Sequence, residues 1–181
     1  HGRLIFYGEK EEAVHKYRIL LNADRFFVGP PLKNRVLIED TKKWAEDIQY
    51  WRQKVGTKEA AIKSVDFINR YRKKCKKIKP EEPLTIKVTF NAKNSIKDVH
   101  FGFAIFRTDG VYCYGPNTDF DGYEILEIKE GEKFFLLKYK KLLLAPGEYR
   151  CSVAIWDKNE TLAYDFHCGC YPLVIEGNNK A

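Results

Sequence analysis

The chain has 181 residues, of which 44% are hydrophobic and 14% aromatic, so it can bury a core and is not expected to be disordered. No apolar run approaches the roughly 20 residues that a membrane-spanning helix needs, and the N-terminus lacks the basic-then-apolar pattern of a signal peptide. The sequence therefore predicts a soluble protein, or part of a longer chain whose other parts contact a membrane.

The positive charge is concentrated in one short segment. The formal net charge is +7, and the run RYRKKCKKIK at residues 70–79 holds seven basic residues and no acidic one, which leaves the rest of the chain balanced. A solvated loop is the simpler interpretation, and contact with anionic lipid headgroups or an acidic partner is the alternative. Nucleic-acid binding usually needs a broader basic face or a recognisable module, so we expect no nucleic-acid partner.

The first 21 residues predict a short strand, a turn at Gly8 and a helix whose apolar side chains recur at three-to-four spacing. A lone strand and helix cannot bury a core by themselves. We therefore interpret residues 1–21 as the end of a larger domain.

Residues 22–55 predict a connector. The sequence Gly29-Pro30-Pro31 excludes a continuous helix in its first part, and an amphipathic helix is predicted from residue 40 to a stop at Gly56. Two interpretations of its apolar face stay open: packing on a partner surface or a second copy, or packing on the chain's own sheet. That face carries Trp44, Ile48, Trp51 and Val55.

From residue 60 onward the pattern changes to short runs of period two, separated by turn signals such as Asp109-Gly110 and Pro146-Gly147. No helical segment lies between these runs, which excludes a parallel α/β order. We predict an all-β fold, an antiparallel immunoglobulin-like β-sandwich over residues 56–176 with a tail at 177–181. The predicted core face holds Ile86, Val88, Phe90, Val99, Phe101, Phe103, Ile105, Tyr149, Cys151, Val153 and Ile155.

The sequence offers little for catalysis. It lacks a phosphate-binding glycine loop and the common hydrolase motifs. Asp119 and Asp121 near Glu124 resemble a carboxylate pair for glycoside hydrolysis, but solvated loop carboxylates are the simpler interpretation. His167 beside Asp165 has no nucleophile assigned to it by sequence. We therefore expect no enzymatic activity in this chain.

The cysteines do not predict a disulfide framework or a metal site. They are five in number and irregularly spaced, which is typical of free thiols in a reducing compartment. Cys168 and Cys170 are separated by one residue, whereas zinc sites usually space their paired cysteines further apart and use a second pair. We expect no metal and no cofactor.

Several short motifs in a fixed order carry a family resemblance. Each is weakly specific alone, and their order and spacing together are more specific. They are Gly56-Thr57-Lys58-Glu59-Ala60-Ala61-Ile62, Gly102-Phe103-Ala104-Ile105, Asp109-Gly110, Gly115-Pro116-Asn117-Thr118, Gly147-Glu148-Tyr149, Ser152-Val153-Ala154-Ile155-Trp156-Asp157 and Tyr164-Asp165-Phe166-His167.

With these motifs, residues 56–176 resemble the C-terminal carbohydrate-binding domain of the ATPase subunit of O-antigen polysaccharide ABC exporters, the Wzt type. Residues 1–21 are similar to the last strand and helix of ABC-transporter ATPase domains. The resemblance implies a dimeric β-sandwich that binds a lipid-linked O-polysaccharide, in some relatives through its non-reducing terminal cap. It also implies a cytoplasmic location at the inner membrane, with the attached nucleotide-binding domain and the transmembrane subunit of the exporter as partners.

The sheet face opposite the core is the predicted carbohydrate site, because rings stack on the C–H faces of sugars while neighbouring polar groups bind hydroxyls. A slip of one residue would invert this assignment. The alternative function is a dimerisation or docking module without sugar contact. We interpret Asn117 as a turn former. The candidate ligand-binding residues are Trp156 as stacking platform, His100 as hydrogen-bond partner, and then Phe106, Tyr112, Tyr114 and Arg150.

Overall fold

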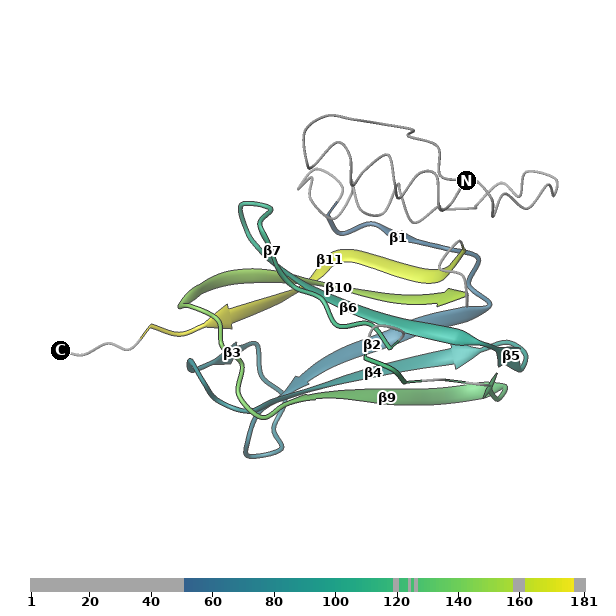
Figure 1. Cartoon of the computed structure of the whole chain (residues 1–181), viewed down its shortest axis with the longest axis horizontal. Coiled ribbons are helices and arrows are strands. Elements are labelled where there is room, and N and C mark those ends of the chain that lie inside the picture. The colour runs from purple at the N-terminus through teal and green to yellow at the C-terminus, as the bar shows by residue number, and fades with distance from the viewer. Residues whose placement is uncertain (1–50, 119–120, 124, 126, 158–161, 178–181) are drawn as a thin grey trace, which may run out of the picture. The chain divides into compact units, whose positions relative to one another are not determined.

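The computed structural model describes residues 51–118, 121–123, 125, 127–157 and 162–177, and these form an all-β fold (Figure 1). The predicted strand and helix of residues 1–21 and most of the predicted connector helix lie outside the described residues. The end of that predicted helix is wrong, because Lys54 and Val55 form a strand. In the described part of the chain, no helix has the length and apolar character that crossing a membrane requires.

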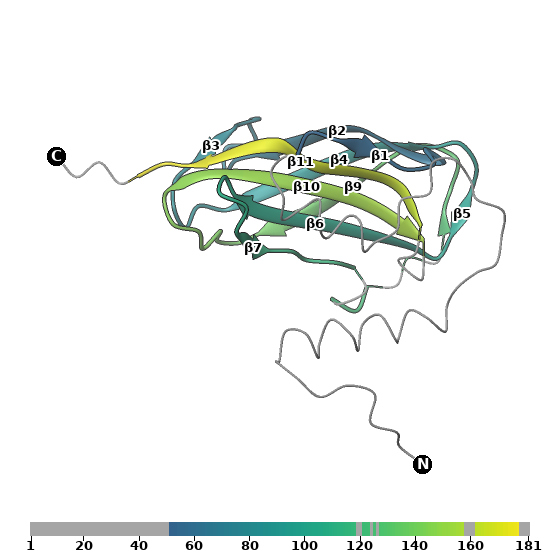
Figure 2. The same cartoon turned by 90° about the horizontal axis from the view of Figure 1, so that it is seen from above.

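Two sheets stack face to face, as the sequence predicted (Figures 1 and 2). Sheet A has the order β1-β11-β10-β6-β7, with β3 paired in parallel to the end of β11, and sheet B has the order β2-β4-β9. The other pairings are antiparallel. Sheet A contains β1 (Lys54–Val55), β3 (Lys77–Ile78), β6 (Val99–Arg107), β7 (Tyr112–Tyr114), β10 (Gly147–Asp157) and β11 (Ala163–Ile175). Sheet B contains β2 (Ala60–Ile68), β4 (Leu84–Ala92) and β9 (Gly131–Tyr139), and a small third sheet pairs β5 (Ile96–Lys97) with β8 (Glu127–Ile128).

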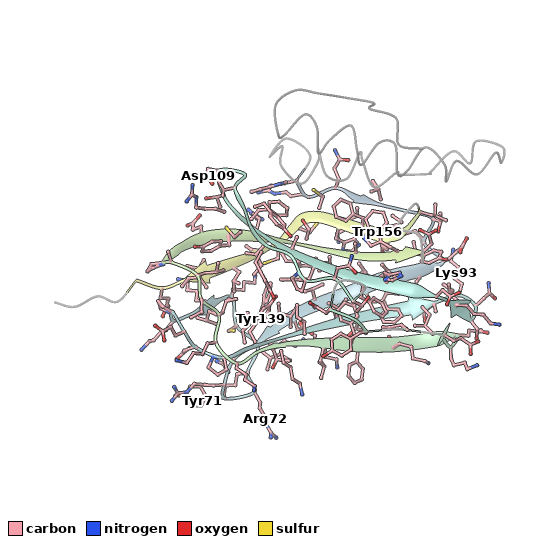
Figure 3. All side chains as sticks on the ribbon, in the orientation of Figure 1. Tyr71, Arg72, Lys93, Asp109, Tyr139 and Trp156 are labelled. Carbon is pink, nitrogen blue, oxygen red and sulfur yellow. The ribbon has the colours of Figure 1, made fainter. Side chains whose placement is uncertain are left out.

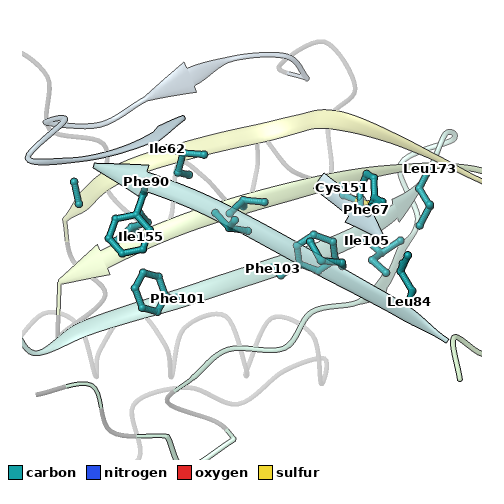
Figure 4. Close-up of a cluster of buried hydrophobic side chains, with 14 of the residues drawn as sticks. Ile62, Phe67, Leu84, Phe90, Phe101, Phe103, Ile105, Cys151, Ile155 and Leu173 are labelled. Carbon is teal, nitrogen blue, oxygen red and sulfur yellow. The ribbon is translucent and has the colours of Figure 1, made fainter. Parts of the chain in front are cut away.

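The core lies between the two sheets, where the predicted core faces meet (Figure 4). In β4 every second residue from Leu84 to Ala92 is buried, because successive side chains of a strand point to opposite faces. Phe101 from sheet A packs between two rings of sheet B, with centroids 5.4 Å from Phe90 and 4.4 Å from Phe135. Each fully buried apolar side chain of this kind contributes about 1.5–3 kcal/mol. The predicted core is therefore confirmed.

The register of β11 against β10 shifts near Gly169. Cys151 pairs with Tyr171 and Val153 pairs with His167, so β11 accommodates two extra residues between them. Gly169 has a φ of +54°, which is the left-handed conformation that glycine adopts readily. Its amide donates a hydrogen bond of 2.8 Å to the hydroxyl of Ser152. The ring of Trp51 packs directly against this glycine.

A second apolar cluster fills the outer face of sheet A. Trp51, just before β1, and Val55, in β1, pack against a group of buried side chains from β10 and β11. Of the two interpretations of the apolar stripe, these two residues support packing on the chain's own sheet, while Trp44 and Ile48 lie outside the described residues. The buried members of the cluster are Ala154, Trp156, Ala163, Phe166 and Cys168.

Candidate functional site

The predicted outer face of sheet A is not an open binding platform. Trp156 is only 6% exposed and its ring centroid lies 6.0 Å from that of Phe166. Phe106 is 2% exposed and its ring lies 6.4 Å from Trp51. The prediction that these two rings present free faces is wrong, because the chain's own apolar cluster covers them.

His100 and Arg150 lie far apart on the same face of sheet A. In the β6–β10 pairing, His100 is opposite Trp156, whereas Arg150 is opposite Phe106, which places the two pairs six residues apart along β10. His100 is half-buried, and its Nδ1 atom has no hydrogen-bond partner among the described residues. Arg150 is also half-buried. The structure therefore does not bring the six predicted residues together at one site.

Tyr112 and Tyr114 are the exposed members of the predicted set, at 54% and 47%. Tyr112 packs its ring 5.3 Å from Phe106, and its hydroxyl donates a 3.4 Å hydrogen bond to the carbonyl of Gly115. Tyr114 instead turns toward sheet B, where its ring lies 5.8 Å from Tyr139 in an edge-to-face arrangement. Tyr114 therefore joins the edges of the two sheets.

Between these edges lies a hollow of about 990 Å³, which we call the open-edge groove. It occurs where β6 and β7 of sheet A and β9 of sheet B leave the side of the sandwich unclosed. Residues from three parts of the chain line it: Phe101, Gly102, Phe103, Tyr114, Pro116, Asn117, Thr118, Asp121, Tyr123, Ile125, Phe135, Leu136, Leu137, Lys138 and Tyr139.

Backbone hydrogen bonds to β6 hold the segment after β7 at the rim of the groove. The amide of Phe103 donates to the carbonyl of Pro116, and the amide of Thr118 donates to the carbonyl of Phe101, each at 3.0 Å. The hydroxyl of Thr118 in turn accepts the amide of Phe101 at 3.0 Å. Two turn bonds follow, in which the amides of Asp121 and Tyr123 donate to the carbonyls of Asn117 and Thr118. These turn bonds agree with the interpretation of Asn117 as a turn former, and Asn117 also lines the groove.

The groove combines rings with hydrogen-bonding groups. Tyr123 is 68% exposed, and its neighbour Asp121 is also exposed. The hydroxyl of Tyr139 is buried without a hydrogen-bond partner among the described residues. Burial raises the pKa of this phenol, with the nearby Tyr114 as the next cause, so Tyr139 keeps its proton and can both donate and accept. Lys138 adds a cation at the rim.

This mixture suits a ligand that has both apolar faces and hydroxyl groups. Tyrosine rings provide surfaces for stacking, and amide, carboxylate and hydroxyl groups provide donors and acceptors in known positions. Asp121 is the single carboxylate among the described lining residues, while Asp119 and Glu124 lie outside the described residues. Sequence reasoning missed Tyr123 and Tyr139. It interpreted Asp121 as a solvated loop carboxylate, with a carboxylate pair for glycoside hydrolysis as the alternative.

His167 and Asp165 belong to a buried network on β11, not to the groove. Nε2 of His167 lies 3.3 Å from Oδ1 of Asp165, and Nδ1 lies 2.5 Å from the hydroxyl of Tyr171. The carboxylate also accepts the amide of Ile62 at 2.8 Å and pairs with Lys58. Burial by itself raises the pKa of Asp165, but the hydrogen bonds from His167 and Lys58 outweigh it and lower the pKa. Through these contacts, the pair of His167 and Asp165 links β11 to β2 and has a structural role.

The cysteine thiols of β11 are not activated. Burial, and then the neighbouring Cys170, raise the pKa of Cys168 to about 12, so its reactive thiolate is scarce at neutral pH. Burial also raises the pKa of Cys170. Among the described residues, no three His, Cys, Asp or Glu side chains gather where they could hold a metal ion.

Comparison with known proteins places the chain in a family. A solved crystal structure of the C-terminal domain of wzt is similar with a TM-score of 0.64 at 17% sequence identity, covering 70% of this chain and 78% of that chain. The CARDB domain of PF1109 from Pyrococcus furiosus matches at 8% identity, covering 65% of this chain and 94% of that chain. Its TM-score of 0.40 is too low to indicate a shared fold. The search of curated proteins gave no match. The model of the Wzt C-terminal domain matches residues 52–181, and the chain therefore belongs to the Wzt C-terminal domain family.

Proposed function

We propose that this chain is a non-catalytic module that binds an O-antigen polysaccharide for an ABC exporter, and that the open-edge groove is its glycan site. Membership of the Wzt C-terminal domain family fits a carbohydrate-binding module of such an exporter. The single observation that carries the site assignment is that Tyr114, Tyr123 and Tyr139 line one groove, and that the buried hydroxyl of Tyr139 has no hydrogen-bond partner among the described residues.

The exposed ring of Tyr123 stacks on the C–H face of one sugar residue, while Asn117 and Asp121 bind its hydroxyl groups. The hydroxyl of Tyr139 gains the partner that it lacks among the described residues, which relieves the cost of leaving a polar atom buried and unpaired. Sugar hydroxyls exchange water for protein at little net gain, so we expect a Kd between about 1 μM and 1 mM. Recognition of a non-reducing terminal cap is part of this proposal.

The test is calorimetric titration of the full chain with the cognate O-polysaccharide. Tyr123→Ala removes an exposed ring and is expected to weaken binding by about tenfold or more. Tyr71→Ala is the matched control, because Tyr71 is 66% exposed, close to the 68% of Tyr123, and does not line the groove. If the two variants and the unchanged chain bind equally well, the groove is not the glycan site. Failure of the unchanged chain to bind the polysaccharide would remove the proposed function itself.

A second function, as a dimerisation module, is favoured by the outer face of β9. Phe134 and Leu136 are 58% and 43% exposed there, with Glu132 and Lys138 at either side on the same face. When two such faces meet antiparallel about a two-fold axis, each Glu132 opposes the Lys138 of the other copy, and each Phe134 opposes a Leu136. A second copy of the chain is therefore the partner that this face fits.

Light scattering after size-exclusion chromatography tests this assembly. Phe134→Ser combined with Leu136→Ser is expected to convert a dimer to a monomer. A dimer that persists in this variant, or a monomer before any change, would contradict it. The attached nucleotide-binding domain, the transmembrane subunit and a cytoplasmic position at the inner membrane complete the proposed context.

A further inference from the structure

One end of the sandwich carries a concentrated positive charge. The pairing of Ile68 with Thr85 and of Leu84 with Tyr139 brings two loops, residues 69–83 and 140–146, to the same end. We call these two loops the basic end. They hold nine basic and two acidic residues. Figure 3 shows Tyr71 and Arg72 projecting from this end, far from Lys93 at the opposite end.

The two loops are tied to each other. The amide of Glu81 donates to the carbonyl of Leu142, and the amide of Leu142 donates to the carbonyl of Glu82, each at 3.2 Å. Lys141 also pairs with Glu81 at 3.3 Å. Leu142 itself is buried at 4% exposure and anchors its loop in the core. The loop of residues 140–146 is therefore held beside residues 81 and 82.

The basic run is also an ordered structure. The side chain of Asn69 accepts the amides of Tyr71 and Lys73 at 3.0 and 3.1 Å, which closes a tight turn. Beyond the turn, Lys77 and Ile78 form β3, and the side chain of Ile78 is 2% exposed. The basic side chains of the run are exposed to solvent, and this turn and β3 give the run an ordered backbone.

Most of these cations make no ion pair with a described carboxylate. Ion pairs join Lys74 to Asp66 at 2.8 Å and Arg70 to Glu82 at a longer 3.9 Å. Like charges gathered in two adjacent loops repel one another, and an anionic surface relieves the repulsion. Within the described part of the chain, six exposed basic side chains of the basic end make no ion pair: Arg72, Lys73, Lys76, Lys77, Lys79 and Lys140.

Two apolar side chains protrude among the cations. Leu143 is 76% exposed and Tyr71 is 66% exposed, with the guanidinium of Arg70 4.8 Å from the centre of the Tyr71 ring. Tyrosine favours the headgroup level of a bilayer, and an aliphatic side chain favours the boundary with the acyl chains. Basic residues beside them gain energy from anionic headgroups. A nucleic acid offers an exposed leucine no comparable apolar environment.

We propose that the basic end binds the surface of an anionic phospholipid bilayer. Tyr71 and Leu143 enter the interfacial region, and the unpaired cations contact the headgroups. The attraction acts over about 8 Å at physiological ionic strength, so the loops must approach the surface directly. This binding is independent of the open-edge groove, which residues of the basic end do not line.

Flotation of the full chain with vesicles tests the proposal. We expect binding to vesicles that mix phosphatidylglycerol with phosphatidylcholine, and no binding to phosphatidylcholine alone. Each basic residue near an anionic surface contributes about fivefold, so Arg72→Glu with Lys73→Glu is expected to weaken binding by about thirtyfold or more. Tyr71→Ser with Leu143→Ser is expected to weaken it severalfold, including at salt concentrations that screen the charges.

The matched control is Lys93→Glu with Lys97→Glu. Both lysines are exposed and both lie at the end of the sandwich opposite the basic end, so the net charge changes equally while binding is expected to stay unchanged. Circular dichroism establishes that each variant is folded. Equal losses in the two charge-reversed pairs would overturn the proposal, as would equal binding to neutral vesicles. Displacement from the vesicles by a short oligonucleotide or a polyglutamate peptide at equal charge would overturn it as well.

Discussion

Trp51 lies directly against Gly169, and a Cβ atom on this glycine would come within 2.6 Å of Cγ of the indole. The bulge of β11 and the ring of Trp51 therefore depend on each other, because the space that the ring occupies exists only while residue 169 has no side chain. This contact anchors the segment before β1 to the outer face of sheet A.

Gly169→Ala is accordingly expected to lower the free energy of unfolding by about 2–4 kcal/mol, since it adds a clash to a left-handed backbone. Gly122→Ala is the matched control: Gly122 also has a positive φ, +72°, but a Cβ there would meet nothing within 4 Å. For this control we expect the free energy of unfolding to fall by about 1 kcal/mol. Urea unfolding of both variants gives the comparison, and equal losses would show that the contact with Trp51 is unimportant.

Trp156→Ala tests the corrected position of this ring. Trp156 is a buried member of the second cluster, so its removal leaves a cavity and is expected to cost about 3–5 kcal/mol of stability. Tyr123→Ala removes an exposed ring and is expected to change stability by less than about 0.5 kcal/mol. Thermal and urea unfolding measure both. Unchanged stability of the Trp156→Ala variant would contradict the burial of this ring.

Asp165 is expected to make stability depend on pH. Its pKa is lower in the folded chain than the usual value of about 3.9, because hydrogen bonds from His167 and Lys58 outweigh the effect of burial. A lowered pKa stabilises the fold above the unfolded value, and that contribution disappears as the pH falls from about 4 through the folded value.

Asp165→Asn is therefore expected to cost about 3 kcal/mol at pH 7, because Lys58 and His167 lose a buried partner. The difference from the unchanged chain should shrink as the pH falls below about 4. Unfolding by urea across the acid range measures it. A difference that stays constant down to the lowest pH would contradict the assignment of the pKa shift.

The thiols give a prediction that needs no substitution. Cys151 and Cys168 are fully buried, and burial raises the pKa of both thiols. We expect neither to react with an aromatic disulfide reagent at neutral pH in the folded chain, whereas all five cysteines react after denaturation. Rapid labelling of Cys151 or Cys168 in the native chain, read by peptide mass spectrometry, would contradict their burial.

The sequence predicted the strands that are buried on one face. In β4 and β6 the alternation is local, since Ile86 and Phe101 differ in polarity from their immediate neighbours, and this is enough to specify both the strand and its inner face. β9 escaped prediction because it is an edge strand with apolar residues on both faces. Phe134 and Phe135 stand next to each other there, and no period of two results.

Whether a sheet face is open was decided by tertiary structure. The alternation correctly placed Trp156 on the face of β10 that points away from the core. It did not reveal that this face is buried beneath Trp51. The open-edge groove likewise needs Tyr114 and Tyr139, which are 25 positions apart and meet only when the two sheets stack. A period of two records the direction of each side chain relative to its own strand, because that direction is local. What covers the side chain depends on contacts between distant segments, which no local pattern contains.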